Sequence, residues 1–121
     1  MNHQKNIDQY LEGWRIGDPS LSYSVTGEKF TYDDPNTGII QKSEFIEFFE
    51  DFKQGVAELK GEAITSPFLN YYDTIIDRSG PIWTVWCWWH AAGSDFQGCA
   101  LIKVGGEGIL SEKISYYTRL P

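Results

Sequence analysis

An aspartate directly before a proline, at the end of a short apolar segment, is the first candidate for chemistry in this sequence. Pro35 lacks an amide hydrogen and ends a strand, and it holds Asp34 in extended geometry at the strand's last position. If that position faces an apolar cavity, the carboxylate is partly desolvated, as a general base requires. Asp-Pro is also an ordinary turn dipeptide, so a purely structural role for Asp34 stays open.

Tyr10 is the second candidate, because its hydroxyl could hydrogen-bond an oxygen on which negative charge develops. With Ile7, Leu11 and Trp14 it recurs at i, i+3, i+4 and i+7, which predicts an amphipathic helix over residues 4–16. A core tyrosine whose hydroxyl is satisfied at the rim is the structural alternative. The catalytic interpretation requires Tyr10 and Asp34 to point into one cavity.

Helices come first among the elements that must position these residues. Asp18-Pro19 predicts a short second helix over residues 19–23. A first strand follows over residues 30–34, and Ser43 is a candidate N-cap for a third helix with Gly55 near its end. The apolar face of that helix is formed by Phe45, Phe48, Phe49, Phe52 and Val56.

The hydrophobic period then changes from 3.6 to 2. Strands are predicted over residues 68–77, 82–92, 96–104 and 109–118, separated by turn residues. Helices followed by an antiparallel meander indicate an α+β domain spanning residues 1–121, in which helices cover one face of a curved sheet.

Composition excludes several classes of function. With 41% hydrophobic and 22% charged residues in 121, the chain suits one soluble domain. No apolar run could span a bilayer and the polar N-terminus lacks a signal-peptide core, so we expect a cytoplasmic protein without membrane contact. The net charge of −7 without a basic stripe argues against nucleic acid.

Metal and nucleotide motifs are missing from the sequence. His3 and His90 are the only histidines, and no paired metal-ligand spacing or glycine-rich phosphate loop occurs, so neither a metal nor a cofactor is expected. Cys87 and Cys99 are interpreted as free thiols, and whether they can pair depends on the length of the loop between their strands.

Both faces of the strand at residues 83–90 are apolar. One face holds Trp83, Val85, Cys87 and Trp89, and the other holds Thr84, Trp86, Trp88 and His90. In a sheet covered by helices on one side and exposed to water on the other, apolar and polar residues should alternate along each strand. We therefore expect a homodimer that covers the outer face, through the residues Trp86, Trp88, Leu101, Ile114 and Tyr116.

In element order the chain resembles the nuclear-transport-factor-2-like superfamily, also called SnoaL-like or cystatin-like α+β cones. The closest motif likeness is to ketosteroid isomerases, in which a helix-1 tyrosine, a Gly-Asp and a strand-ending Asp-Pro stand at spacings similar to Tyr10, Gly17-Asp18 and Asp34-Pro35. The resemblance implies a curved antiparallel sheet wrapped around N-terminal helices to form a cone-shaped cavity. It also implies that Asp34 is the general base and that Tyr10 stabilises the oxyanion.

Two positions depart from the ketosteroid isomerase pattern. Ala100 stands where the family has a protonated carboxylic acid, with no carboxylate nearby on that strand, and Phe49 replaces a supporting tyrosine. The loss of one oxyanion donor typically costs a factor of about 10²–10³ in rate. Steroid isomerisation is therefore doubtful, whereas a weaker proton transfer remains compatible with the sequence.

Two hypotheses follow. The first is a cofactor-independent enzyme, of isomerase, cyclase or dehydratase type, that moves a proton on a hydrophobic carbonyl compound. The second is a ligand-binding or protein-interaction domain of the same fold without turnover. By the resemblance, Lys113 and Tyr117 face inward, although a solvated strand-end lysine is the alternative for Lys113. The expected pocket is lined by Trp14, Phe49, Trp83, Val85, Cys87, Phe96, Lys113 and Tyr117.

Overall fold

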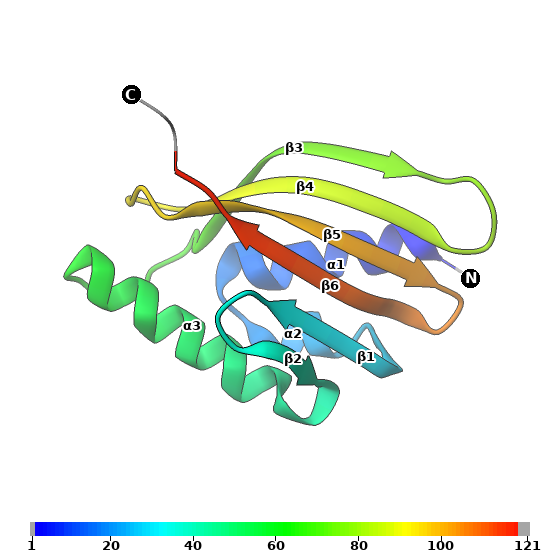
Figure 1. The fold of residues 1–121 in the computed structure, drawn as a ribbon, viewed down its shortest axis with the longest axis horizontal. Helices are drawn as coiled ribbons and strands as arrows, with labels where there is room; N and C mark the ends of the chain where they lie inside the picture. Colours follow the sequence, from blue (N-terminus) through cyan, green and yellow to red (C-terminus); the bar gives the residue numbers. More distant parts are fainter. Residues whose placement is uncertain (1, 119–121) are drawn as a thin grey trace.

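The computed structural model describes residues 2–118 and contains N-terminal helices packed on one six-stranded sheet (Figure 1). The helical elements are α1 (His3–Ile16), α2 (Pro19–Tyr23), the 3₁₀ turn η1 (Lys42–Glu44) and α3 (Phe45–Lys60). The strands are β1 (Thr26–Asp34), β2 (Gly38–Gln41), β3 (Leu69–Asp77), β4 (Trp83–Ala91), β5 (Gln97–Gly105) and β6 (Gly108–Tyr116).

The sheet has the order β2-β1-β6-β5-β4-β3, and its neighbours are antiparallel except for the parallel pair β1–β6. That pair places the first long strand beside the last. In Figure 1 α1 lies behind the strands β5 and β6, so the helices cover one face of the sheet and the other face is turned to the viewer. The predicted α+β architecture with a curved sheet is confirmed.

Helix boundaries follow the local capping chemistry. The Asp18 side chain accepts hydrogen bonds from the backbone N–H groups of Ser20 and Leu21, which starts α2 at Pro19 as predicted. The third helix differs from the prediction. Ser43 lies inside η1 and does not cap α3, and the helix runs past Gly55 to Gly61, which ends it with a positive φ of 76°.

Strand β1 is longer than predicted and β2 was missed. β1 begins at Thr26, before the apolar residues, and β2 is a short edge strand whose residues Gly38, Ile39 and Gln41 are exposed. An exposed edge strand of four residues carries no alternation that could have revealed it.

The sheet register fixes which side chains face the helices. Residues opposite one another in antiparallel pairs share a face. Cys87 lies opposite Ala100, which lies opposite Ile114, and all three are buried on the inner face. Trp88 lies opposite Cys99, which lies opposite Ser115, on the outer face. The two cysteines are therefore on opposite faces, and both are free thiols.

Candidate functional site

A carboxylate that the sequence analysis did not single out lies at the centre of the inner sheet face. Glu112 on β6 stands opposite Ile102 on β5, and Tyr32 on β1 is its partner on the other side. Its exposed fraction is 3%. The two neighbouring strands thus offer this side chain an apolar surface and an aromatic ring, and no positive charge.

Tyr10 on α1 donates a hydrogen bond of 2.5 Å from its hydroxyl to Oε1 of Glu112, and both residues are buried. Burial raises the pKa of Glu112 to about 7, although the hydrogen bond from Tyr10 acts in the opposite direction. The pKa of Tyr10 is raised well above its ordinary value, first by burial and then by the negative charge of Glu112. Near neutral pH the pair therefore holds a neutral phenol and a carboxyl group that exchanges a proton.

Trp14 adds an unsatisfied donor to this pair. Its side chain is 1% exposed, and its indole N–H has no hydrogen-bond partner among the described residues. The Trp14 side chain nevertheless lowers the pKa of the Tyr10 hydroxyl, against the larger effect of burial. Tyr10, Trp14 and Glu112 are called the interior cluster below.

Asp34 lies at the opposite end of β1 from the helix α2 and is 2% exposed. Its Oδ2 accepts a hydrogen bond from the Tyr116 hydroxyl, and its Oδ1 accepts one of 2.7 Å from the backbone N–H of Asn36. The second bond is the turn role expected of Asp-Pro, so the structural part of that interpretation is confirmed. Burial and the bond to Asp34 raise the pKa of Tyr116.

A hollow of about 240 Å³ opens beside Asp34. It is called the rim hollow below, and it is lined by Asp34, Asn36, Thr37, Phe48, Asp51, Phe52 and Tyr116. Tyr10 is not among these residues. The structure therefore places Asp34 at an open hollow and Tyr10 in a sealed core, each with its own partner.

A layer of rings separates the two places. The Phe52 ring lines the rim hollow, and its centroid is 5.6 Å from that of Trp14 in the interior cluster. The Tyr116 ring packs 5.1 Å from Phe96 and 5.9 Å from Trp89. Phe52, Trp89, Phe96 and Tyr116 are called the ring layer. Beneath it the Phe49 ring stacks on Trp14 at 3.9 Å, so the space between helices and sheet is filled with aromatic side chains.

Most of the expected pocket residues do face the helices. Val85 and Cys87 are fully buried on the inner face, where burial raises the pKa of the Cys87 thiol. Trp83 lies at the far end, with its ring centroid 4.9 Å from that of His3. Ala100 is also inward, as the resemblance implied.

Two expected pocket residues face outward, which corrects their assignment. Lys113 lies on the outer face, with a side chain 70% exposed and an ion pair of 3.6 Å to Asp33. Tyr117 is exposed, and its hydroxyl meets that of Tyr72. Ile114 and Tyr116 were assigned to the outer patch and instead point inward: Ile114 is 3% exposed, and Tyr116 belongs to the ring layer.

One error of phase explains all of these differences. The resemblance implies that Lys113, Ser115 and Tyr117 face inward, and by strand alternation this phase would turn Glu112 outward. The alternation of apolar Ile114 and Tyr116 with polar Lys113 and Ser115 was the available signal for the opposite phase. Read that way, Glu112 falls on the buried face two residues before Ile114.

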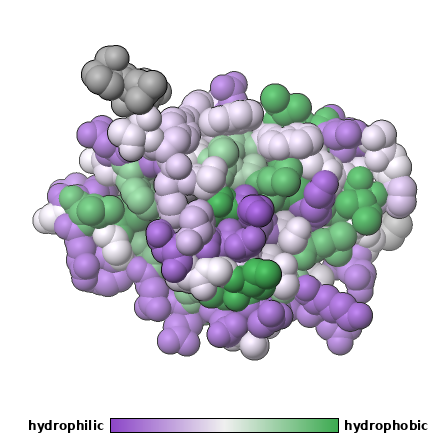
Figure 2. Space-filling view, in the orientation of Figure 1, coloured by the Kyte–Doolittle hydropathy of each residue, from purple (hydrophilic) through white to green (hydrophobic). Residues whose placement is uncertain are grey.

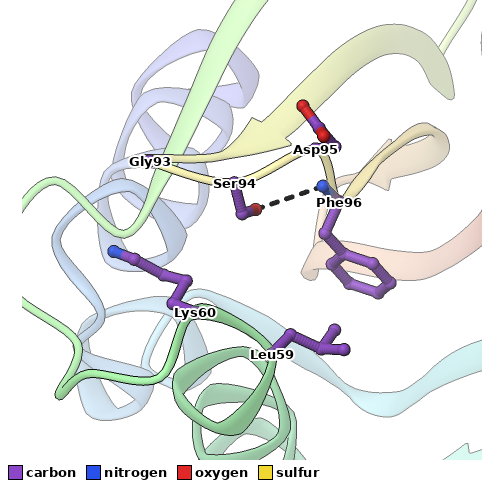
Figure 3. A pocket seen from close by; sticks show the side chains of 6 residues that line it. All are labelled: Leu59, Lys60, Gly93, Ser94, Asp95 and Phe96. Carbon is purple, nitrogen blue, oxygen red and sulfur yellow. Dashed lines mark hydrogen bonds between the residues drawn. The ribbon is translucent and has the colours of Figure 1, made fainter.

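Another hollow lies between the end of α3 and the β4–β5 turn, and it has a volume of about 460 Å³ (Figure 3). The Ser94 hydroxyl there is already bonded to Ala91 O and to the Phe96 N–H. Figure 3 shows the Lys60 ammonium and the Asp95 carboxylate pointing away from each other and from the Phe96 ring. Polar groups that do not converge make this hollow a weaker candidate than the rim hollow.

The outer sheet face carries an apolar row across three strands. Ile75 on β3, Trp86 on β4 and Leu101 on β5 stand opposite one another, and Ile75 and Trp86 are 58% and 42% exposed. In Figure 2, which views this face, hydrophobic and pale side chains cover much of the sheet, whereas hydrophilic ones border it along α3 and the lower edge.

Other kinds of site are not apparent in residues 2–118. Within that range no group of three or more His, Cys, Asp or Glu side chains could hold a metal ion. No helix in the same range is long and apolar enough to cross a membrane.

Comparisons with known proteins identify the fold. No family model matches the chain, and no curated protein matches it. Solved structures do match. A proposed polyketide cyclase from Xanthomonas campestris has a TM-score of 0.66 at 14% identity, covering 97% of this chain and 93% of the other. A proposed ketosteroid isomerase from Kribbella flavida has a TM-score of 0.62 at 11% identity, covering 99% and 81%.

A third structure is a protein of unknown function from Cytophaga hutchinsonii that is described as NTF2-like. Its TM-score is 0.61 at 13% identity, and the match covers 95% of this chain and 89% of that one. Likeness at such identities concerns the fold. The chain has the α+β cone fold of the nuclear-transport-factor-2-like, or cystatin-like, proteins.

Proposed function

We propose that the protein is a SnoaL-like small-molecule enzyme that transfers a proton on a hydrophobic carbonyl compound without a cofactor. The observation that carries this proposal is the interior cluster: a buried carboxyl group, a buried phenol bonded to it and an unpaired indole N–H, all within an aromatic core.

The interior cluster makes the folded protein less stable than it would be with an apolar core at the same place. A buried carboxyl group with a single hydrogen-bond donor among the described residues is expensive to desolvate. An unpaired buried N–H costs a further ~1–3 kcal/mol. Phe and Leu side chains of similar size would fill the same space without either penalty. Costly polar groups in a core that does not need them favour a functional role.

The chemistry of the cluster suits a carbonyl oxygen. The neutral form of Glu112, the Tyr10 hydroxyl and the Trp14 N–H are all donors that could stabilise a developing oxyanion. Ketosteroid isomerases use a neutral carboxylic acid in this way. Asp34, whose oxygens accept hydrogen bonds from the neutral donors Tyr116 and Asn36, would be the base that removes the proton.

The spacing of β6 residues sets the size of the compound. Glu112, Ile114 and Tyr116 lie along one face, and a strand rises ~3.3 Å per residue, so the first and last α-carbons are ~13 Å apart. Only an elongated compound of several rings spans that length. It can enter only if rings of the ring layer move, because Phe52 lies between the rim hollow and Trp14.

A second candidate function is a non-catalytic ligand-binding or protein-interaction domain. It is favoured by the aromatic filling of the cone and by the pairing of Tyr10 and Asp34 with Glu112 and Tyr116 instead of with each other.

Solvent-deuterium exchange into a panel of cyclic ketones separates the two candidates. We expect Asp34→Asn to abolish exchange and the matched variant Asp33→Asn, on the outer face, to leave it unchanged. We expect wild-type exchange to decline above pH 7, where Glu112 loses its proton, and we expect Glu112→Gln, which keeps a neutral donor, to lack this decline. Unchanged turnover in Asp34→Asn rules out Asp34 as the base. Tight ketone binding without exchange in the wild type supports the second candidate.

We also propose that the outer face pairs with a second copy of the chain through the row Ile75, Trp86 and Leu101. Exposed apolar residues on adjacent strands are uncommon on the surface of a monomer. Sedimentation velocity at micromolar concentration should show a dimer, and Trp86→Lys should shift it to monomer. Ile39→Lys, at a position on β2 that is more exposed than Trp86 (62% against 42%), should not. A wild type that is entirely monomeric contradicts the proposal.

A further inference from the structure

The rim hollow combines three aromatic rings with two carboxylates. Phe48 and Phe52 come from α3 and Tyr116 from the end of β6, whereas Asp34 ends β1 and Asp51 lies on α3. With a volume of about 240 Å³ it is smaller than the roughly 300–1,000 Å³ of sites that enclose whole drug-sized ligands. It therefore suits one group of a ligand.

Among residues 2–118, no lysine, arginine or histidine lines this hollow. Lys53, on the same helix as Asp51, donates to Gly17 O and lies 4.0 Å from Glu50. Lys113 pairs with Asp33 on the opposite face of the sheet. Within the described part of the chain, Asp34 accepts hydrogen bonds from two neutral donors, the Tyr116 hydroxyl and the Asn36 N–H.

Aromatic rings and uncompensated carboxylates recognise the same kind of ligand group. A cation within about 6 Å of a ring centroid is attracted by the negative face of the ring. The carboxylates add an attraction that a neutral group of the same shape does not experience, and they repel an anion. The rings are what distinguish this hollow from a pair of acidic surface residues.

We propose that the rim hollow binds an organic ammonium group, with its positive nitrogen among Phe48, Phe52 and Tyr116 and beside Asp34 and Asp51. This inference rests on the proposed function, in which the same hollow holds part of the substrate. It adds that the substrate carries a positively charged nitrogen. A positive charge beside the reacting carbon also stabilises the negative charge that proton removal leaves there.

Choline and 3,3-dimethylbutan-1-ol test this directly, because they share a shape and differ in whether the centre of the headgroup is N⁺ or C. Titration of the full chain is followed by calorimetry and by the NMR shifts of the Asn36 and Thr37 amides. We expect choline to bind and to shift those amides, and the neutral alcohol to bind at least about threefold more weakly.

Variants locate the binding. Asp51→Asn and Phe48→Leu should each weaken choline about threefold or more, whereas Asp33→Asn, which removes the same charge on the outer face, should not. Equal binding of the two probes, equal loss in Asp33→Asn and Asp51→Asn, or shifts away from the hollow would each overturn the inference. Choline binding is measured without turnover. If ketone exchange depends on Asp34 but choline does not bind, this inference is wrong and the proposed function is unaffected.

Discussion

Glu112 and Asp34 are two buried carboxylates, and each accepts a hydrogen bond from a tyrosine hydroxyl. They differ in what else surrounds them. Glu112 sits between an isoleucine and a tyrosine in the middle of the sheet, whereas Asp34 sits at a strand end, with a backbone N–H as second donor and a hollow beside it.

The comparison shows how position along the sheet determines which groups surround a buried carboxyl group. In the middle of a strand the neighbouring backbone groups are used by the ladder, so a carboxyl group has only side chains to stabilise its charge. At a strand end the turn supplies a further donor, here the backbone N–H of Asn36. The proposed division of roles, with Glu112 as donor and Asp34 as base, rests on this difference in surroundings.

The largest effect should come from the protonation of Glu112. The group has an ordinary pKa of 4.5 and is raised to about 7 in the folded protein. The folded state then binds more protons than the unfolded state between these values, so the contribution to stability is complete below pH 4.5 and is lost as the pH rises through 7. At 1.36 kcal/mol per pH unit the loss is about 3 kcal/mol.

Urea unfolding measures this loss. The change in unfolding free energy between pH 5 and pH 8 is determined for the wild type and for Glu112→Gln, and the two changes are compared. The variant, which does not titrate there, should lack it. Equal pH dependence in the two proteins would show that Glu112 is ionised in the fold, and the contrast with Asp34 would disappear.

Tyr10→Phe should have the next largest effect, a destabilisation of ~1–3 kcal/mol, because it leaves a buried carboxyl group without its donor. The hydrogen bond from Tyr10 lowers the pKa of Glu112, so its removal should move the pH-dependent loss to higher pH. Denaturant unfolding between pH 5 and pH 9 tests this. If Tyr10→Phe loses stability but the pH at which the pH-dependent loss occurs stays the same, Tyr10 contributes by packing.

Tyr116→Phe should cost less, about 0.5–1.5 kcal/mol, because the ring stays packed and Asp34 keeps the N–H of Asn36. A double-mutant cycle with Asp34→Asn isolates the bond from the loss of either group alone. A coupling energy indistinguishable from zero would show that solvent replaces the hydroxyl, and that the rim is less ordered than the interior.

The smallest effect belongs to a third carboxylate. Asp33 pairs with Lys113 on the outer face, with side chains 38% and 70% exposed. Lys113→Ala should change the unfolding free energy by no more than about 0.5 kcal/mol, since exposed ion pairs contribute little. A change above 1 kcal/mol at 0.15 M salt would indicate that the outer face is covered, as in the proposed dimer.

Much of the fold could be predicted because its signals are local. Pro19 after Asp18, the helical spacing of Tyr10 and Trp14, and the turn residues between strands each depend on a few neighbouring positions. The site depends on pairings that no local pattern encodes. Tyr10 on α1 meets Glu112 on β6 across 102 positions of sequence, and the phase that turns Glu112 inward is indicated only by the alternation around Ile114.

The parallel pairing of β1 with β6 has a consequence for the synthesis of the chain. The two tyrosine–carboxylate bonds join residues 102 and 82 positions apart. A growing chain carries Tyr10 and Asp34 early, yet each waits for a partner on the last strand, and contacts so distant in sequence form late and slowly. A chain interrupted before Glu112 could therefore build helices and hairpins but hold neither bond, so only a nearly complete molecule would acquire the site.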